Sequence, residues 1–273
     1  MGLNPIEYAP WKERRTVLGK RFLIMVEKIF KQKLRSKAIW AILIIGSILV
    51  HVFPILTAAL IPKKELTAEL ILNYLKGDIF FLFTLLLAAV VCSNLISQDI
   101  KDRSLVLYFS RPLKSDGYIL GKLGGAFSMI AVYCLLPPLI VCTSIIATQT
   151  GDAYLESLKV LSRTVVAGCL ISSFLLPYAL LLSSLTKRRA YAGIGTFMSI
   201  YALNISSLFL VRFDHNWRLL NPTNLLNFTL EIIYGFGLPD KIDAGLYGVS
   251  FVLFISIPLA LLFYRIHSKE VGR

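Results

Sequence analysis

Long apolar runs separated by short polar segments dominate the sequence. Six of these runs approach or exceed the roughly 20 residues that an α-helix needs to cross the hydrocarbon core of a bilayer. They lie at residues 38–61, 79–96, 121–148, 160–185, 190–211 and 246–264. What remains is too short and too scattered for a separate soluble domain. The pattern therefore predicts one all-α integral membrane domain with six transmembrane helices, spanning residues 1–273.

The segment before the first apolar run, residues 16–37, has a different pattern. Basic residues alternate with apolar residues at near-helical spacing, the latter being Leu18, Phe22, Met25, Val26, Ile29, Phe30 and Leu34. We expect an amphipathic helix that lies along the membrane interface, with its apolar face toward the acyl chains and its cations near anionic head groups. The alternative is a basic stretch that only fixes the topology of the first span.

Composition and charge support a membrane protein and predict its orientation. Hydrophobic residues make up 56% of the chain, and the mean hydropathy is +0.70, far above soluble norms. If the amino terminus is inside, the whole basic excess of +13 falls in the inner segments, at residues 1–37, 97–123, 186–191 and 265–273. This is what the positive-inside rule requires. Nucleic-acid binding is disfavoured, because it needs a soluble basic face.

We therefore expect a multi-pass protein of the cell membrane with both termini in the cytoplasm. Residues 1–37 would form a cytoplasmic lead-in, residues 38–264 the six-span body, and residues 265–273 a cytoplasmic tail. The lipid bilayer is the first expected partner, and no nucleic acid is expected.

The polar segment between the second and third runs is the most informative part of the chain. Asp99 and Arg103 are four residues apart, so on a helix they would share a face and could pair. One apolar face would follow, formed by Leu105, Tyr108 and Phe109. An exposed apolar face at a membrane surface usually contacts a protein partner or lipid.

Two helix-breaking signals flank this short apolar face. Arg111 precedes Pro112, which disfavours a continued helix at that point. Ser115 or Asp116 can cap the next helix, which leads into Gly121 and Lys122. The sequence therefore predicts a short cytoplasmic helix between two breaks, located between spans 2 and 3.

At these residues the chain resembles the permease subunits of type-2 ABC exporters. Their loop contains an acidic residue, a Ser/Thr-Leu pair, a Ser/Thr-x-Pro-Leu/Ile motif and a Gly-Lys pair at the start of the third span. The matching positions here are Asp99, Ser104-Leu105, Ser110, Pro112-Leu113 and Gly121-Lys122. Family members often have Gly where this chain has Arg103, so the local turn is the point at which this chain departs from the pattern.

The resemblance implies a coupling helix around residues 104–113 that docks into a groove on a separate ABC ATPase subunit. It assigns ATPase coupling to Asp99, Arg103, Ser104, Leu105, Tyr108, Phe109, Arg111, Pro112 and Lys122. It also implies a second permease chain, as a homodimer or with a sister permease. The helix within residues 16–37 would be the connecting helix of the family and pack beside the ATPase.

The sequence itself indicates that the motor is a separate protein. No G-x-x-x-x-G-K-[ST] phosphate loop is present, so we expect a transport subunit rather than an enzyme. ATP and Mg would be bound by the partner ATPase, with no cofactor in this chain. The histidines are isolated and the cysteines have no ligand spacing, so no metal site is expected.

The polar segment after the fifth run, residues 212–243, contains its own turn and apolar stretch. Asn221, Pro222, Thr223 and Asn224 are typical of a helix start. The resemblance implies short extracellular helices that cap the pathway, and it assigns an extracellular gate to Asn221, Pro222, Phe228 and Glu231. The alternative is a surface-lying helix that only seals the domain.

Other functional classes fit the sequence less well. An intramembrane enzyme needs polar groups that converge at membrane depth, and a secondary transporter usually has buried ionisable residues or repeats. The predicted spans are almost bare of ionisable residues. A secondary transporter, a channel-like protein or a membrane scaffold without an ATPase partner is the alternative to the exporter permease.

Overall fold

The computed structural model describes residues 21–52, 54–56, 68–105, 108, 115–147 and 149–271, and within these ranges the regular structure is helical. The helices are α1 (Arg21–Leu34), α2 (Lys37–Gly46), η2 (Ser47–His51), α4 (Ala68–Leu75), α5 (Asp78–Ser93), α6 (Ser97–Lys101), α8 (Ser115–Ile146), α9 (Asp152–Phe174), α10 (Leu176–Leu185), α11 (Arg189–Leu210), η3 (His215–Leu220), α12 (Pro222–Tyr234) and α13 (Ala244–Val271).

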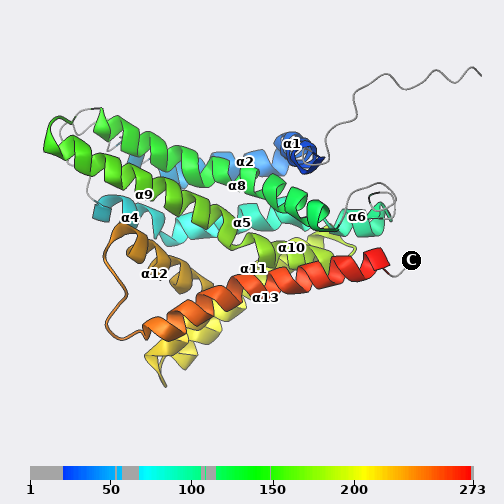
Figure 1. The fold of residues 1–273 in the computed structure, drawn as a ribbon. Helices are drawn as coiled ribbons and strands as arrows, with labels where there is room; N and C mark the ends of the chain where they lie inside the picture. Colours follow the sequence, from blue (N-terminus) through cyan, green and yellow to red (C-terminus); the bar gives the residue numbers. More distant parts are fainter. Residues whose placement is uncertain are drawn as a thin grey trace, which may run out of the picture.

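The long helices form an elongated bundle (Figure 1). α1, α6 and the C-terminal end of α13 lie at one end, which we call the basic end. α4, α12 and the start of α13 lie toward the other, which we call the distal end. These two ends correspond to the predicted cytoplasmic and extracellular sides.

Five helical stretches among the described residues are long and apolar enough to cross a membrane. They are Asp78–Lys101, Ser115–Ile146, Ala153–Leu185, Arg189–Leu210 and Ala244–Lys269. A sixth is present if the bent pair Phe22–Leu34 and Lys37–His51 counts as one span. The predicted all-α membrane fold is confirmed. The count of six stays a prediction, because residues 57–61 of the first predicted span lie outside the described residues.

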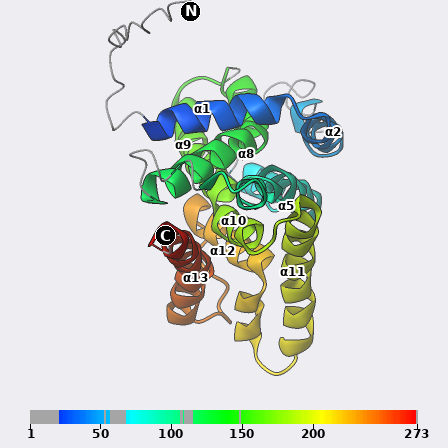
Figure 2. The same cartoon turned by 90° about the vertical axis from the view of Figure 1, so that its right-hand side faces the viewer.

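The predicted amphipathic helix before the first span is present as α1. It meets α2 at a bend of 76°, and Figure 2 shows it lying across the basic end of the bundle. Its middle packs tightly on α8, where a Cβ added at Gly125 would lie 2.7 Å from the Ile29 side chain. Ile29 is therefore buried against protein, whereas Phe22 and Leu23 stay exposed. The expectation that the whole apolar face meets acyl chains is thus wrong for Ile29.

α5 lies at the centre of the bundle, packed against α2, α8, α10 and α11. In the most apolar stretch of Asp78–Lys101, 67% is buried inside the bundle. The same share is only 17% in the most apolar stretches of α11 and α13. The predicted fourth span is broken at Leu175, where Pro177 occupies the first turn of α10, as its fixed φ allows. The core is therefore built around α5, with α11 and α13 at the periphery.

Candidate functional site

A short turn interrupts the helix at the basic end of α5 before the loop begins. A turn at residues 94–96 separates α5 from α6, and the Ser183 hydroxyl of α10 accepts hydrogen bonds from the amides of Ile96, at 3.3 Å, and Ser97, at 3.2 Å. The same hydroxyl donates to the Ser93 carbonyl oxygen at 3.2 Å. These bonds satisfy backbone groups that the break leaves unpaired, and they fix the direction in which α6 leaves the bundle.

Asp99 of α6 then lies beside the first turns of α8. Its Oδ2 forms an ion pair with Lys122 Nζ at 2.7 Å and accepts a hydrogen bond from the Tyr118 hydroxyl at 2.6 Å. Its Oδ1 accepts from the Ser104 hydroxyl at 3.2 Å. The side chains of Asp99 and Lys122 are 14% and 7% exposed. We call these four side chains the Asp99 network.

The predicted pairing of Asp99 with Arg103 is wrong, since Asp99 pairs with Lys122. The i, i+4 argument required a continuous helix, but α6 ends at Lys101. Arg103 is exposed and adopts φ 53°, in the left-handed region that glycine occupies most easily. The chain thus makes a glycine-type turn at this position with an arginine, and the turn carries Ser104 back to Asp99.

The residues after the turn are less exposed than the sequence indicated. Leu105 is buried, at 7% exposed. Tyr108 is half-buried, and its ring centroid lies 5.4 Å from that of Tyr118. Burial, with a further contribution from the Asp99 charge, raises the pKa of Tyr108, so its hydroxyl keeps its proton. The other predicted coupling residues, Phe109, Arg111 and Pro112, lie outside the described residues.

A cavity of about 660 Å³ opens beside the Asp99 network and is bounded by α1. Asp99, Tyr108 and Lys122 line one side. The α1 side is mostly cationic or polar, with Glu27, Lys28, Lys31, Gln32 and Arg35. The structure therefore places α1 and the side chains of Asp99, Tyr108 and Lys122 on a common surface.

Sequence reasoning missed two residues that shape this end of the bundle. Lys33 projects from α1 and is buried, bonded to the Val91 carbonyl oxygen and the Asn94 side chain. The burial of Lys33 could have been noticed in the sequence, because this cation lies one helical turn after Ile29, within the apolar stripe of the helix. Ser183 had a weaker signal, a Ser-Ser pair inside an apolar run, where small polar residues often bond between helices.

At the distal end, α12 begins where the sequence predicts. The Asn221 side chain caps the helix by accepting from the amides of Thr223, at 2.8 Å, and Asn224, at 3.3 Å. Pro222 occupies the first turn, and Gly235 ends the helix with φ 92°. Phe228 is 8% exposed. One side of α12 is therefore buried among the long helices. The choice between a gate and a helix that only seals the domain stays a prediction.

Polar side chains connect α12 to the elements around it. Glu231 forms an ion pair with Lys76, which lies in the link before α5. The other contacts reach three spans: Thr223 accepts from Asn204 of α11 at 3.1 Å, Tyr234 bonds Thr164 of α9 at 2.8 Å, and Thr229 bonds Tyr247 of α13 at 2.7 Å. α12 thus links four neighbouring elements, and movement of any one of these would strain its contacts.

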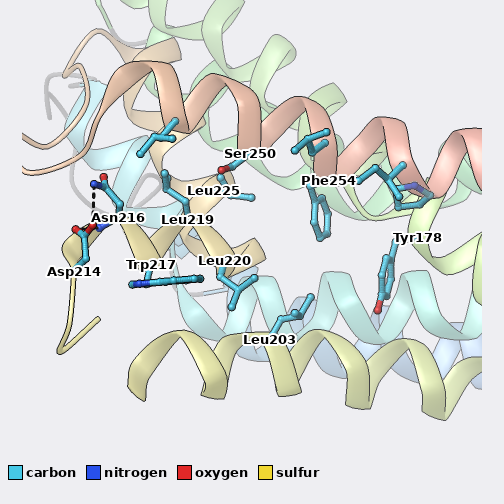
Figure 3. A pocket seen from close by; sticks show the side chains of 14 residues that line it. Tyr178, Leu203, Asp214, Asn216, Trp217, Leu219, Leu220, Leu225, Ser250 and Phe254 are labelled. Carbon is cyan, nitrogen blue, oxygen red and sulfur yellow. Dashed lines mark hydrogen bonds between the residues drawn. The ribbon is translucent and has the colours of Figure 1, made fainter. Parts of the chain in front are cut away.

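An apolar cavity of about 590 Å³ lies next to α12, between α11 and α13. Figure 3 shows Leu203 of α11, Leu219 and Leu220 of η3 and Phe254 of α13 around it. Asp214 and Asn216 line its distal end, where the Asp214 carboxylate accepts from the Asn216 backbone amide at 2.9 Å. Within the described part of the chain, no cluster of His, Cys, Asp and Glu could hold a metal ion.

Comparison with protein families supports a membrane transport protein. A family model described as "ABC-2 family transporter protein" matches residues 27–204. The match covers more than half of the chain, running from α1 through the Asp99 network into α11, and it ends before η3 and α12. No curated protein matches the chain.

Proposed function

Because the chain belongs to the ABC-2 family of transporter proteins, we propose that it is the membrane-spanning permease of an ATP-driven exporter, coupled to a separate ATPase subunit. Membership makes it a multi-pass membrane subunit of an ABC transporter, in a family that generally works with an ABC ATPase. The proposal adds the direction of transport, the coupling residues and the cytoplasmic location of the basic end.

The Asp99 network is the observation that carries this proposal. It joins the end of α5, through α6, to the loop residue Ser104 and to Lys122 on α8. A displacement of the loop would therefore act on two spans together. The ATPase would bind two conformations of the permease with different free energies. The equilibrium between these conformations can shift by no more than that difference in binding free energy.

The cavity beside the Asp99 network supports a docking role for this surface. Three of its α1 residues, Lys28, Lys31 and Arg35, are basic, and Glu27 is paired with Lys31. The surface therefore suits a partner segment with acidic side chains. ATP and Mg would be bound on that partner, and ATP-driven approach of two ATPases would move both loops of a dimer.

A second copy of the chain completes the proposed pathway. α11 and α13 expose most of their apolar surface in the single chain, so lipid or a second permease must cover it. At the distal end, α12 would act as a gate that opens when its bonds to α9, α11 and α13 and the Lys76–Glu231 ion pair are broken. Asn221 and Pro222 set where this gate helix starts, and Phe228 anchors it.

The first test is purification of the tagged full-length chain from its own membranes. We expect a phosphate-loop ATPase to co-purify and to hydrolyse ATP in the complex. A secondary transporter, a channel or a scaffold would purify without such a protein, and that result would contradict the proposal.

The second test measures the coupling of ATP hydrolysis to a conformational change of the permease, and it does not require the cargo to be identified. Spin labels at the distal ends of the two copies should report a distance change when ATP is added to the reconstituted complex. Arg111→Ala should abolish that change while ATP hydrolysis continues. Lys241→Ala is the matched control, because Lys241 is an exposed residue at the distal end. This variant should show the same ATP-dependent distance change as the wild type. A normal distance change in Arg111→Ala would show that the coupling segment is wrongly assigned.

A further inference from the structure

A groove lies between α2 and α11 and is lined by residues of both helices. Figure 2 shows these two helices on the side of the bundle away from α13. Both helices pack on α5, which forms its floor, and α1 closes it at the basic end. The cavity in this groove has a volume of about 720 Å³. Its deeper lining is apolar, with Ile39, Leu86, Val90 and Phe197.

The lining changes character at the basic end. There the cavity is bounded by Gln32, Lys33, Ser36, Ser93, Asn94 and Arg189. Both ionisable side chains in the whole lining, Lys33 and Arg189, are cations. The groove therefore combines an apolar channel at membrane depth with a cationic, hydroxyl-bearing end at the membrane surface.

Lys33 is a buried cation without a carboxylate partner. It is 3% exposed, and its ammonium donates to the Val91 carbonyl oxygen and to Asn94 Oδ1. Among the described residues these two neutral oxygens are its acceptors, which leaves one of its three N–H groups without an acceptor. Burial of a charge is costly unless a counter-charge lies nearby. An anion in the groove would supply that counter-charge.

Arg189 adds a second cation at the first residue of α11. The N-cap of this helix, Arg188, makes no side-chain capping hydrogen bond, so the first amides of α11 are open to another acceptor. A helix amino terminus also carries a partial positive charge that favours anions. Lys33, Arg189 and Ala190 at the start of α11 thus line the same cavity.

We propose that this groove binds an anionic phospholipid, with its phosphate beside Lys33 and Arg189 and an acyl chain between α2 and α11. The apolar channel favours a lipid over a soluble anion. Its rim is exposed, with Ile194 at 57% and Met198 at 61%, so a chain can enter from the bilayer. Basic pockets between transmembrane helices are suited to anionic head groups. The proposal requires a membrane protein but does not depend on ATPase coupling.

Native mass spectrometry of the purified full-length chain tests this directly. The protein is released from nanodiscs of dioleoylphosphatidylcholine that contain increasing fractions of dioleoylphosphatidylglycerol. Wild type should retain phosphatidylglycerol in preference to phosphatidylcholine. Arg189→Gln should weaken retention by at least about fivefold, the effect of one basic residue near anionic lipid. Lys187→Gln removes an equally exposed cation outside the groove lining and should leave retention unchanged.

A second variant blocks the channel and keeps both cations. A Cβ at Gly193 would meet its nearest atoms at 3.5 Å, so Gly193→Leu can be accommodated with its side chain in the groove. This variant should also lose phosphatidylglycerol. Equal effects of Arg189→Gln and Lys187→Gln would overturn the proposal, as would effective competition by soluble glycerophosphate. Disulfide linkage of two copies through Met198→Cys would show that a second chain, rather than lipid, covers the groove.

Discussion

Replacement of Asp99 by Asn tests the Asp99 network with a minimal change of shape. The variant removes the negative charge while Lys122, at 6% exposed, keeps its positive charge in the same position. Loss of one partner of a buried ion pair typically costs about 3–5 kcal/mol, because the other charge stays buried without compensation. The asparagine oxygen can take the place of Oδ2 and still accept from Tyr118, while the amide NH2 takes the place of Oδ1 and can donate to the Ser104 hydroxyl. We therefore expect a loss near the lower end, about 3 kcal/mol.

The loss is measured as the free energy of unfolding of the full-length chain in mixed micelles. A double-mutant cycle of Asp99→Asn with Lys122→Met isolates the contribution of the pair, and we expect a coupling energy of about 2 kcal/mol. Asp102→Asn is the matched control, because Asp102 is exposed and its carboxylate accepts from the side chain of Gln98, at 2.7 Å. We expect this control to change stability by about 0.5 kcal/mol or less.

Two results would refute this reasoning. One is a loss in Asp99→Asn no greater than that in Asp102→Asn. The other is simple additivity in the cycle, which would mean that Lys122 gains nothing from the carboxylate at 2.7 Å. Either result would leave the link between α6 and α8 without the energy needed to transmit a displacement.

Five further substitutions test other features of the fold by the same unfolding measurement. Arg103→Gly should stabilise the chain by about 1 kcal/mol, because the φ of 53° at Arg103 is strained for arginine and free of strain for glycine. A loss of stability would show that residue 103 does not adopt this left-handed turn. Gly125→Leu should cost about 1–3 kcal/mol or more by overpacking the contact with α1, whereas Gly195→Leu, which enters open space, should be close to neutral. Tyr133→Phe should be neutral or stabilising by up to about 1 kcal/mol, because its buried hydroxyl has no partner among the described residues. Tyr74→Phe, which breaks the bond to His51, should be destabilising.

The sequence predicted elements whose signals are local. The predicted run 190–211 agrees with α11, Arg189–Leu210, to within one residue, whereas α9 begins at Asp152, eight residues before the predicted start at 160. Asn221 marked the start of α12. These features depend on the hydrophobic period, capping and backbone preferences, which neighbouring residues determine. The bend before α2 was likewise visible as a change from an amphipathic to a fully apolar pattern.

The contacts between elements could not be predicted in the same way. The sequence placed Asp99 and Lys122 in one polar segment, but a spacing rule assigned Asp99 to Arg103 because it assumed that the helix continued beyond Lys101. Periodicity identified the apolar face of α1 without showing that Ile29 meets glycines of α8 instead of lipid. The burial of Lys33 depends on Val91 and Asn94, both distant in sequence.

Site-specific photo-crosslinking tests the central claim most directly, namely that the segment at residues 104–113 contacts a separate ATPase. Benzoylphenylalanine introduced in place of Arg111 should, in intact membranes, form an adduct with a protein that carries a phosphate loop. The same group in place of Phe213, which is 85% exposed after α11, should form no such adduct. An adduct with the ATPase from position 213 but not from position 111, or none from either, would contradict the account.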